Sequence, residues 1–216
     1  MTLRNLVLKD EYRSDRDDLI LEFLAPCLSN CSQFDRSIEF VTAKSVTAIL
    51  DGFQNIVDKE VKIRIVTGHR FNSEDLGLLT KILDDIKKNR QSYKENSADF
   101  ETYDVLKKII QTEKLQIKIA IPRSDNSGGF FAENVGIFKD LEGNSVVFRG
   151  MSNETFSNNK NFESIDVFTS WKEKSRTETK IRNFEELWND TTSNVRVYDI
   201  QTALKNKLLR YNFRIT

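Results

Sequence analysis

Apolar residues in this chain recur in seven short runs that are rich in Val, Ile and Phe and partly alternate with polar residues. Such runs are typical of β-strands, whose side chains point alternately to the two faces of a sheet. The predicted strands are Ser37–Ala43, Val61–Gly68, Leu115–Pro122, Asn134–Asp140, Ser145–Gly150, Ser164–Trp171 and Val195–Ile200.

Longer stretches between these runs carry apolar residues three or four positions apart, which predicts amphipathic helices. Ser73, ahead of two acidic residues, and Thr177 are typical helix starts. The predicted helices lie within Arg16–Asn30, Lys44–Asp58, Ser73–Arg90, Asp99–Lys114 and Arg182–Asp190.

Helices separate the early strands, and a hairpin then follows, so the pattern predicts an α/β fold with a mixed β-sheet flanked by helices on both faces. The hairpin turn is "DLEGNS" (Asp140–Ser145), in which Gly143 and Asn144 are the residues that most readily take positive φ. The chain has two prolines and no Ser/Gly-rich linker, so we expect residues 1–216 to form a single domain.

Composition narrows the class of protein without naming a partner. The chain is 38% hydrophobic and 31% charged, with 33 basic and 33 acidic residues, so net charge gives no hint of nucleic acid. No apolar run is long enough to span a bilayer, and the charged N-terminus does not resemble a signal peptide. We therefore expect a cytoplasmic protein with no membrane partner.

Metal-ligating residues are few. Cys27 and Cys31 are four positions apart, on one face of a predicted helix, and His69 is the single histidine. A zinc site needs more ligands than these. We expect reduced structural thiols, no metal and no cofactor.

The most informative stretch runs from Gly129 to Trp171 and contains "FAENVGIFKD", "VFRGMSNETF" and "FESIDVF". It resembles the phospholipase D-like nuclease domain, in the branch that accompanies restriction enzymes and defence helicases. That family carries His-x-Lys on one strand, an Asp a few residues later, and Gly-Ser-x-Asn after the next strand. The likeness covers most of the chain more loosely. The tail, residues 190–216, resembles the stretch that often leads into a helicase, so it could extend toward such a partner.

The resemblance can be carried over position by position. Four residues match family positions: Asp140, Gly150, Asn153 and Glu163. Three do not: Ala132 stands at the nucleophilic histidine, Asn134 at the phosphate-binding lysine and Met151 at the motif serine.

These replacements change the chemistry that the resemblance implies. In the family, histidine attacks phosphorus to form a phospho-histidine, and lysine and asparagine balance the charge on the phosphate oxygens without a metal. A methyl group at Ala132 cannot attack, Asn134 carries no charge, and Met151 offers a weak acceptor at best. We expect that the chain does not cut, that Asn153 still donates to a phosphate and that Glu163 orients its neighbours. The replaced residues are consistent with natural decay or with deliberate substitution.

Other residues suggest a nucleic-acid surface. Lys172, Lys174 and Arg176, together with Arg149, could grip phosphates near the motif; the alternative for the Trp171–Trp188 stretch is a solvated helix start with its tryptophans in the core. His69 follows a strand end and could act as a relocated base, or be an ordinary loop residue.

Three functions therefore remain open. The first is a homodimeric, catalytically degenerate nuclease-family subunit of a restriction or phage-defence system that binds DNA or RNA. The second is a dimerisation or docking scaffold without nucleic-acid contact. The third is an active metal-independent endonuclease with relocated catalytic residues.

Overall fold

The computed structural model describes residues 2–42, 46, 61–92, 100–123, 129–151 and 162–211. Its strands are β1 (Glu11–Arg13), β2 (Gln33–Ile38), β3 (Lys62–Gly68), β4 (Arg70–Phe71), β5 (Leu115–Pro122), β6 (Val135–Lys139), β7 (Ser145–Gly150), β8 (Ser164–Thr169), β9 (Val195–Asp199) and β10 (Arg210–Tyr211). Its helices are the short η1 (Leu3–Asn5), the π-helix η2 (Leu19–Leu24), α1 (Ala25–Asn30), α3 (Ser73–Lys88), α4 (Phe100–Gln111), α5 (Lys174–Trp188) and α6 (Ile200–Lys205).

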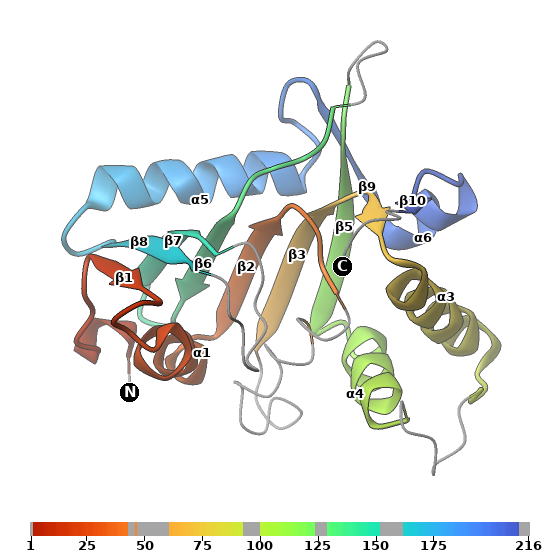
Figure 1. Cartoon of the computed structure of the whole chain (residues 1–216), viewed down its shortest axis with the longest axis horizontal. Helices are drawn as coiled ribbons and strands as arrows, with labels where there is room; N and C mark the ends of the chain where they lie inside the picture. Colours follow the sequence, from red (N-terminus) through yellow and green to blue (C-terminus); the bar gives the residue numbers. More distant parts are fainter. Residues whose placement is uncertain are drawn as a thin grey trace.

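One eight-stranded sheet organises the described residues, with strand order β1-β8-β7-β6-β2-β3-β5-β9. The central strands β2, β3 and β5 are parallel, and every other pair in this sheet is antiparallel. Figure 1 shows α5 on one side of the sheet and α1, α3 and α4 on the other. The predicted fold class, a mixed α/β sheet with helices on both faces, is confirmed.

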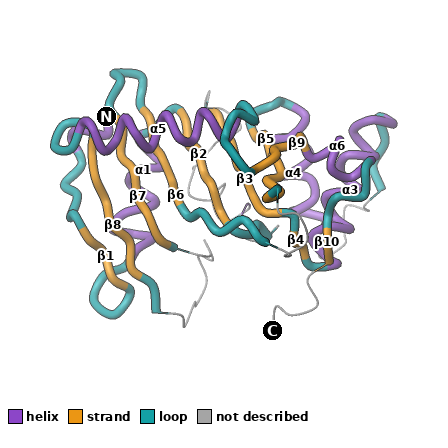
Figure 2. The backbone as a smooth tube through the Cα atoms, turned by 90° about the horizontal axis from the view of Figure 1, so that it is seen from above, coloured by secondary structure: helices purple, strands orange, loops and turns teal. Residues whose placement is uncertain are grey.

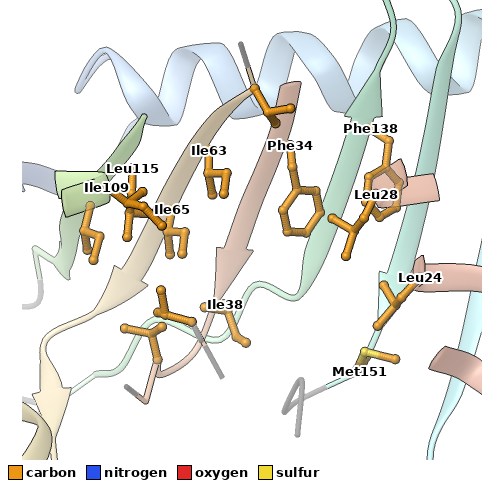
Figure 3. Packing of buried hydrophobic residues seen from close by; sticks show 14 of the residues in the cluster. Leu24, Leu28, Phe34, Ile38, Ile63, Ile65, Ile109, Leu115, Phe138 and Met151 are labelled. Carbon is orange, nitrogen blue, oxygen red and sulfur yellow. The ribbon is translucent and has the colours of Figure 1, made fainter. Parts of the chain in front are cut away.

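Two apolar cores lie on the two faces of this sheet. The larger core packs the sheet against η2, α1, α3 and α4. Within it Phe34 and Phe138 stack with ring centroids 4.7 Å apart, on neighbouring strands, as Figure 3 shows. The smaller core packs the other face against Phe184, Leu187 and Trp188 of α5.

A buried charge network fastens α5 to the sheet. Asp35, on β2, is 0% exposed, and both its oxygens accept from Arg64 of β3 at 2.7 and 2.8 Å. Arg64 also donates to Glu185 of α5 at 2.6 Å, and Lys139 lies 2.9 Å from Asp35. Hydrogen bonds to Arg64 hold the pKa of Glu185 below its ordinary value.

Several sequence-based boundaries were wrong. The second strand is Gln33–Ile38 instead of Ser37–Ala43, because Asp35 and Arg36 are buried in it and interrupt its apolar pattern. In the hairpin turn Gly143 takes φ +82°, whereas Asn144 does not have positive φ. Helix α5 begins at Lys174, before the predicted Arg182, and the predicted helix at residues 44–58 lies outside the described residues apart from Val46.

Some short or late elements were not predicted. These are β1, β4 and β10, each of two or three residues. In the tail, Val195–Asp199 pairs with β5 as an edge strand of the main sheet. Cys27 and Cys31 are buried free thiols, and burial raises the pKa of Cys27 well above its ordinary value. No helix in the part of the chain that the structure describes is long and apolar enough to cross a membrane.

Candidate functional site

The matched and replaced motif positions meet largely at one edge of the sheet. The carboxyl ends of β2, β3 and β7 lie there beside the amino ends of β6 and β8, because Val135 pairs with both Ser37 and Arg149, and Gly150 pairs with Ile165. We call this the motif edge. It comprises residues 39–40, 68–70, 129–134, 149–151 and 162–163.

Ala132 and Asn134 lie two positions apart in the chain segment that enters β6. Ala132 is exposed. The side-chain oxygen of Asn134 accepts a hydrogen bond from the backbone N–H of Glu39 at 3.4 Å, and its backbone oxygen accepts one from Gly150 N–H at 3.1 Å. Asn134 thus links the ends of β2, β6 and β7.

Gly150 and Met151 leave β7 through two consecutive positive φ angles, +114° and +57°. A Cβ on Gly150 would lie 2.4 Å from the backbone oxygen of Ser164, so this exit requires glycine. The Met151 side chain is 6% exposed and belongs to the large core, near Leu24 in Figure 3. The Met151 side chain therefore serves packing and presents no acceptor at the edge.

A buried arginine holds the same exit. Arg36 is 0% exposed and lies over the Phe148 ring at 5.1 Å. Its Nη2 donates to the backbone oxygen of Met151 at 2.6 Å, and its Nη1 donates to the backbone oxygen of Ser37 at 3.2 Å. Arg36 was missed by sequence reasoning, because a charged residue just before the predicted strand Ser37–Ala43 gives no sign that it is buried.

Glu163 lies at the motif edge, ahead of β8. Its backbone N–H donates to Ser14 Oγ at 2.9 Å, and its backbone oxygen accepts from Ser14 N–H at 2.9 Å. These bonds join it to the segment after β1. Asn153, the other matched position, lies outside the described residues.

Asp140 does not reach the motif edge. It follows the carboxyl end of β6, about 20 Å along the strand from Asn134. Its carboxylate accepts from Leu3 N–H at 2.9 Å and from Asn144 N–H at 2.8 Å, so it ties the hairpin turn to the segment at Leu3. Burial alone would raise the pKa of Asp140, but these hydrogen bonds lower it on balance.

The predicted phosphate-binding residues lie at two opposite edges of the sheet. Lys172, Lys174 and Arg176 follow the carboxyl end of β8, at the opposite edge of the sheet. Each forms an ion pair there: Lys172 with Asp10 at 2.9 Å, Lys174 with Glu178 at 3.8 Å and Arg176 with Glu173 at 3.1 Å. The structure thus does not bring them to the motif. Arg149 is exposed and does lie at the motif edge.

His69 also reaches the motif edge, beyond β3. It is 4% exposed and lines a small hollow with Glu39, Arg70, Phe130 and Phe131. Burial first, then the charges of Arg210 and Arg70, lower the pKa of His69 below its ordinary value. This hollow unites residues from three separate strand ends, which sequence spacing could not reveal.

No group of histidine, cysteine, aspartate and glutamate able to hold a metal ion occurs among the described residues. No protein-family model and no curated protein matches the sequence.

Several solved structures are similar to this chain. NucT from Helicobacter pylori is similar over 87% of this chain and 98% of its own, with 12% identity and a TM-score of 0.47. The phospholipase D family member Nuc from Salmonella typhimurium is similar over 88% and 96%, with 14% identity and a TM-score of 0.43. A mutant of yeast tyrosyl-DNA phosphodiesterase is similar over 67% of this chain and 27% of its own, with 14% identity and a TM-score of 0.39. Likenesses at these TM-scores carry no functional argument.

Proposed function

We propose that this chain is a phospholipase D-like nuclease-family protein that binds a nucleic-acid phosphodiester at the motif edge without cutting it. One observation carries the proposal. Ala132, Asn134, Glu163 and the backbone of Met151, which come from three separate segments of the chain, meet at one sheet edge, and the exposed side chain at the nucleophile position is a methyl group.

The motif edge has groups that can bind a phosphate, but the family's nucleophilic histidine is absent from it. Asn134 carries amide hydrogens that can donate to a phosphate oxygen, and the cation of Arg149 is exposed beside it. A phosphate bound there would meet hydrogen-bond donors and positive charge, while hydrolysis would lack a group to attack phosphorus. The basic side chains favour this function over a docking scaffold without nucleic acid.

The wider setting in this proposal is a restriction or phage-defence system, with the chain acting as a homodimer beside a helicase or another subunit. Light scattering during size-exclusion chromatography tests the dimer, for which a mass near twice 25.1 kDa is expected. A monomeric mass at all concentrations would remove the dimer from the proposal and leave phosphodiester binding intact.

A gel series with labelled single-stranded and duplex DNA tests binding and cutting together, with chelator present. The chain as it stands should shift DNA and leave it uncut. The double variant Ala132→His/Asn134→Lys should regain metal-independent cutting, and adding Met151→Ser tests whether the buried methionine must also change. No shift with any DNA or RNA would overturn the proposal.

The series also tests a relocated base. Cutting by the unaltered chain would contradict the proposal, and its loss in His69→Gln would then assign the activity to His69. Arg176→Gln, at the opposite edge of the sheet, is the matched control and should shift DNA as the unaltered chain does.

A further inference from the structure

Two arginines lie directly opposite each other at one end of the motif edge. Arg70 on β4 and Arg210 on β10 are register partners in a parallel strand pair, shown side by side in Figure 2. Like charges on facing strand positions repel each other. In the described part of the chain neither guanidinium has a carboxylate partner, so an anion between them would relieve the repulsion.

The neighbouring histidine gives a second, independent sign of a ligand. His69 is 4% exposed, and its buried Nδ1 has no hydrogen-bond partner among the described residues. Arg210 N–H donates to the backbone oxygen of His69 at 2.8 Å, which holds the backbone of His69 against the strand that carries Arg210. A buried polar atom without a partner is uncommon in a folded protein, and an anion or its bound water could satisfy this one.

Exposed aromatic rings occur at both ends of the motif edge, each beside an arginine. Phe130 is 51% exposed, with the Arg70 guanidinium 5.2 Å from its ring centroid. Phe162 is 62% exposed, with the Arg13 guanidinium 5.0 Å from its ring centroid. Rings that stack on bases and cations that contact the backbone are the two elements of single-strand binding sites.

The spacing of these pairs suits an extended strand. His69 and Arg70 follow β3, and Phe162 precedes β8, four strand positions away across β2, β6 and β7. At about 4.8 Å for each position, the two ends of the edge are about 19 Å apart, and Ala132 and Asn134 lie between them. In a duplex the base faces are stacked and paired, so rings such as these can be used only by unpaired bases.

We propose that the motif edge is a track for single-stranded nucleic acid. One phosphate of the strand lies between Arg70 and Arg210 beside His69. Bases stack on Phe130 and on Phe162, on either side of the motif. This inference rests on the proposed function and adds to it the class of nucleic acid and the residues that select it.

Fluorescence anisotropy tests the track with labelled oligo(dT), oligo(U) and a DNA duplex. The affinity for both single strands should exceed that for the duplex by roughly 10-fold or more. A preference for oligo(dT) or for oligo(U) would show whether the track favours DNA or RNA. Phe130→Leu and Phe162→Leu should each weaken single-strand binding by roughly 5- to 100-fold, whereas Phe130→Tyr, which keeps the ring, should not. Unchanged affinity in both leucine variants would overturn the track.

The arginine pair has its own readout. Arg70→Gln/Arg210→Gln should flatten the plot of log affinity against log salt by about 0.7, the loss expected for one phosphate contact on a single strand. Lys174→Gln, at the opposite edge of the sheet, is the matched control and should leave the slope unchanged. An unchanged slope in the double variant would overturn the phosphate subsite.

The single histidine allows a direct test at atomic level. In a ¹³C-labelled protein the imidazole of His69 gives one Cε1–H signal, which should move on addition of oligo(dT) and titrate at higher pH in the complex. The anion adds negative charge beside Arg70, Arg210 and Glu39, so the complex should bind more protons and affinity should rise as pH falls. Sulfate is added in parallel, at a concentration equal to that of the phosphate groups in the oligo(dT). If sulfate moves the His69 signal equally, the subsite is a general anion site, and its place in the track is overturned.

The two proposals fail differently. If neither single strand nor duplex binds, the proposed function fails and the track with it. If single strand and duplex bind equally, Arg149→Gln weakens both, and the Phe130 and Phe162 variants bind normally, then the proposed function stands and the track is wrong.

Discussion

Arg36, 0% exposed within β2, donates from Nη2 to the backbone oxygen of Met151 at 2.6 Å, across 115 positions of sequence. This bond holds the chain where it leaves β7 through two positive φ angles. A buried cation thus fixes the backbone at the position that the resemblance gives to a motif serine.

Replacing Arg36 with methionine should therefore disturb the motif edge. The carbonyl oxygens of Met151 and Ser37 lose their donor, and an unsatisfied buried carbonyl costs about 1–3 kcal/mol of unfolding free energy. Urea denaturation measures this loss. Arg36→Lys, which keeps the charge but not the planar fork, should recover only part of it. Full stability in Arg36→Met would show that the bond is not needed.

Gly150→Ala should destabilise the protein by about 1–3 kcal/mol, because the new methyl would meet Ser164 O in a backbone conformation that alanine rarely adopts. Gly77→Ala is the matched control. It lies inside α3 with nothing within 4 Å of its Cβ position, so it should stabilise by about 0.5–1 kcal/mol. Thermal unfolding of the two variants should shift in opposite directions, and a shared direction would contradict the assignment.

Asp35→Ala should lower the free energy of unfolding by about 3–5 kcal/mol, since it leaves Arg64 and Lys139 with one fewer partner beneath α5. The comparison is Asp104→Ala, which removes an i,i+4 pair with Lys108 at 2.8 Å on the exposed side of α4. That change should cost at most about 0.5 kcal/mol. Equal losses in the two variants would mean that the network adds nothing beyond a surface pair.

Stability should fall in acid in a way that depends on Asp85. Burial alone would raise its pKa, but hydrogen bonds from Ser92, Tyr103 and Arg90 hold it well below the ordinary value. The carboxylate therefore stabilises the fold above the unfolded-state pKa, and this stability is lost as pH falls from about 5 toward the folded pKa. Chemical denaturation between pH 7 and 3 should show a shallower decline in Asp85→Asn than in the unaltered chain. Parallel declines would exclude this role.

The strongly patterned parts of the fold could be predicted from the sequence. Leu115–Pro122 and Ser145–Gly150 have the predicted bounds, because Val, Ile and Phe dominate those strands. The strand Gln33–Ile38 was displaced in the prediction, since its Asp35 and Arg36 look solvated until their buried partners are known. Sequence pattern describes the local environment of a strand, and those partners lie on other elements.

By itself the sequence determined the α/β class, the succession of most strands along the chain and the residue types at the positions that the resemblance marks, Ala132, Asn134 and Met151. These features depend on residue type and local period. Only the tertiary structure decided that Asp140 and Lys172 lie at the opposite edge from Ala132, that Met151 turns into the core and that Arg70 faces Arg210. The physical reason is that strand direction and register, which are set by pairing between distant segments, decide which strand ends share an edge.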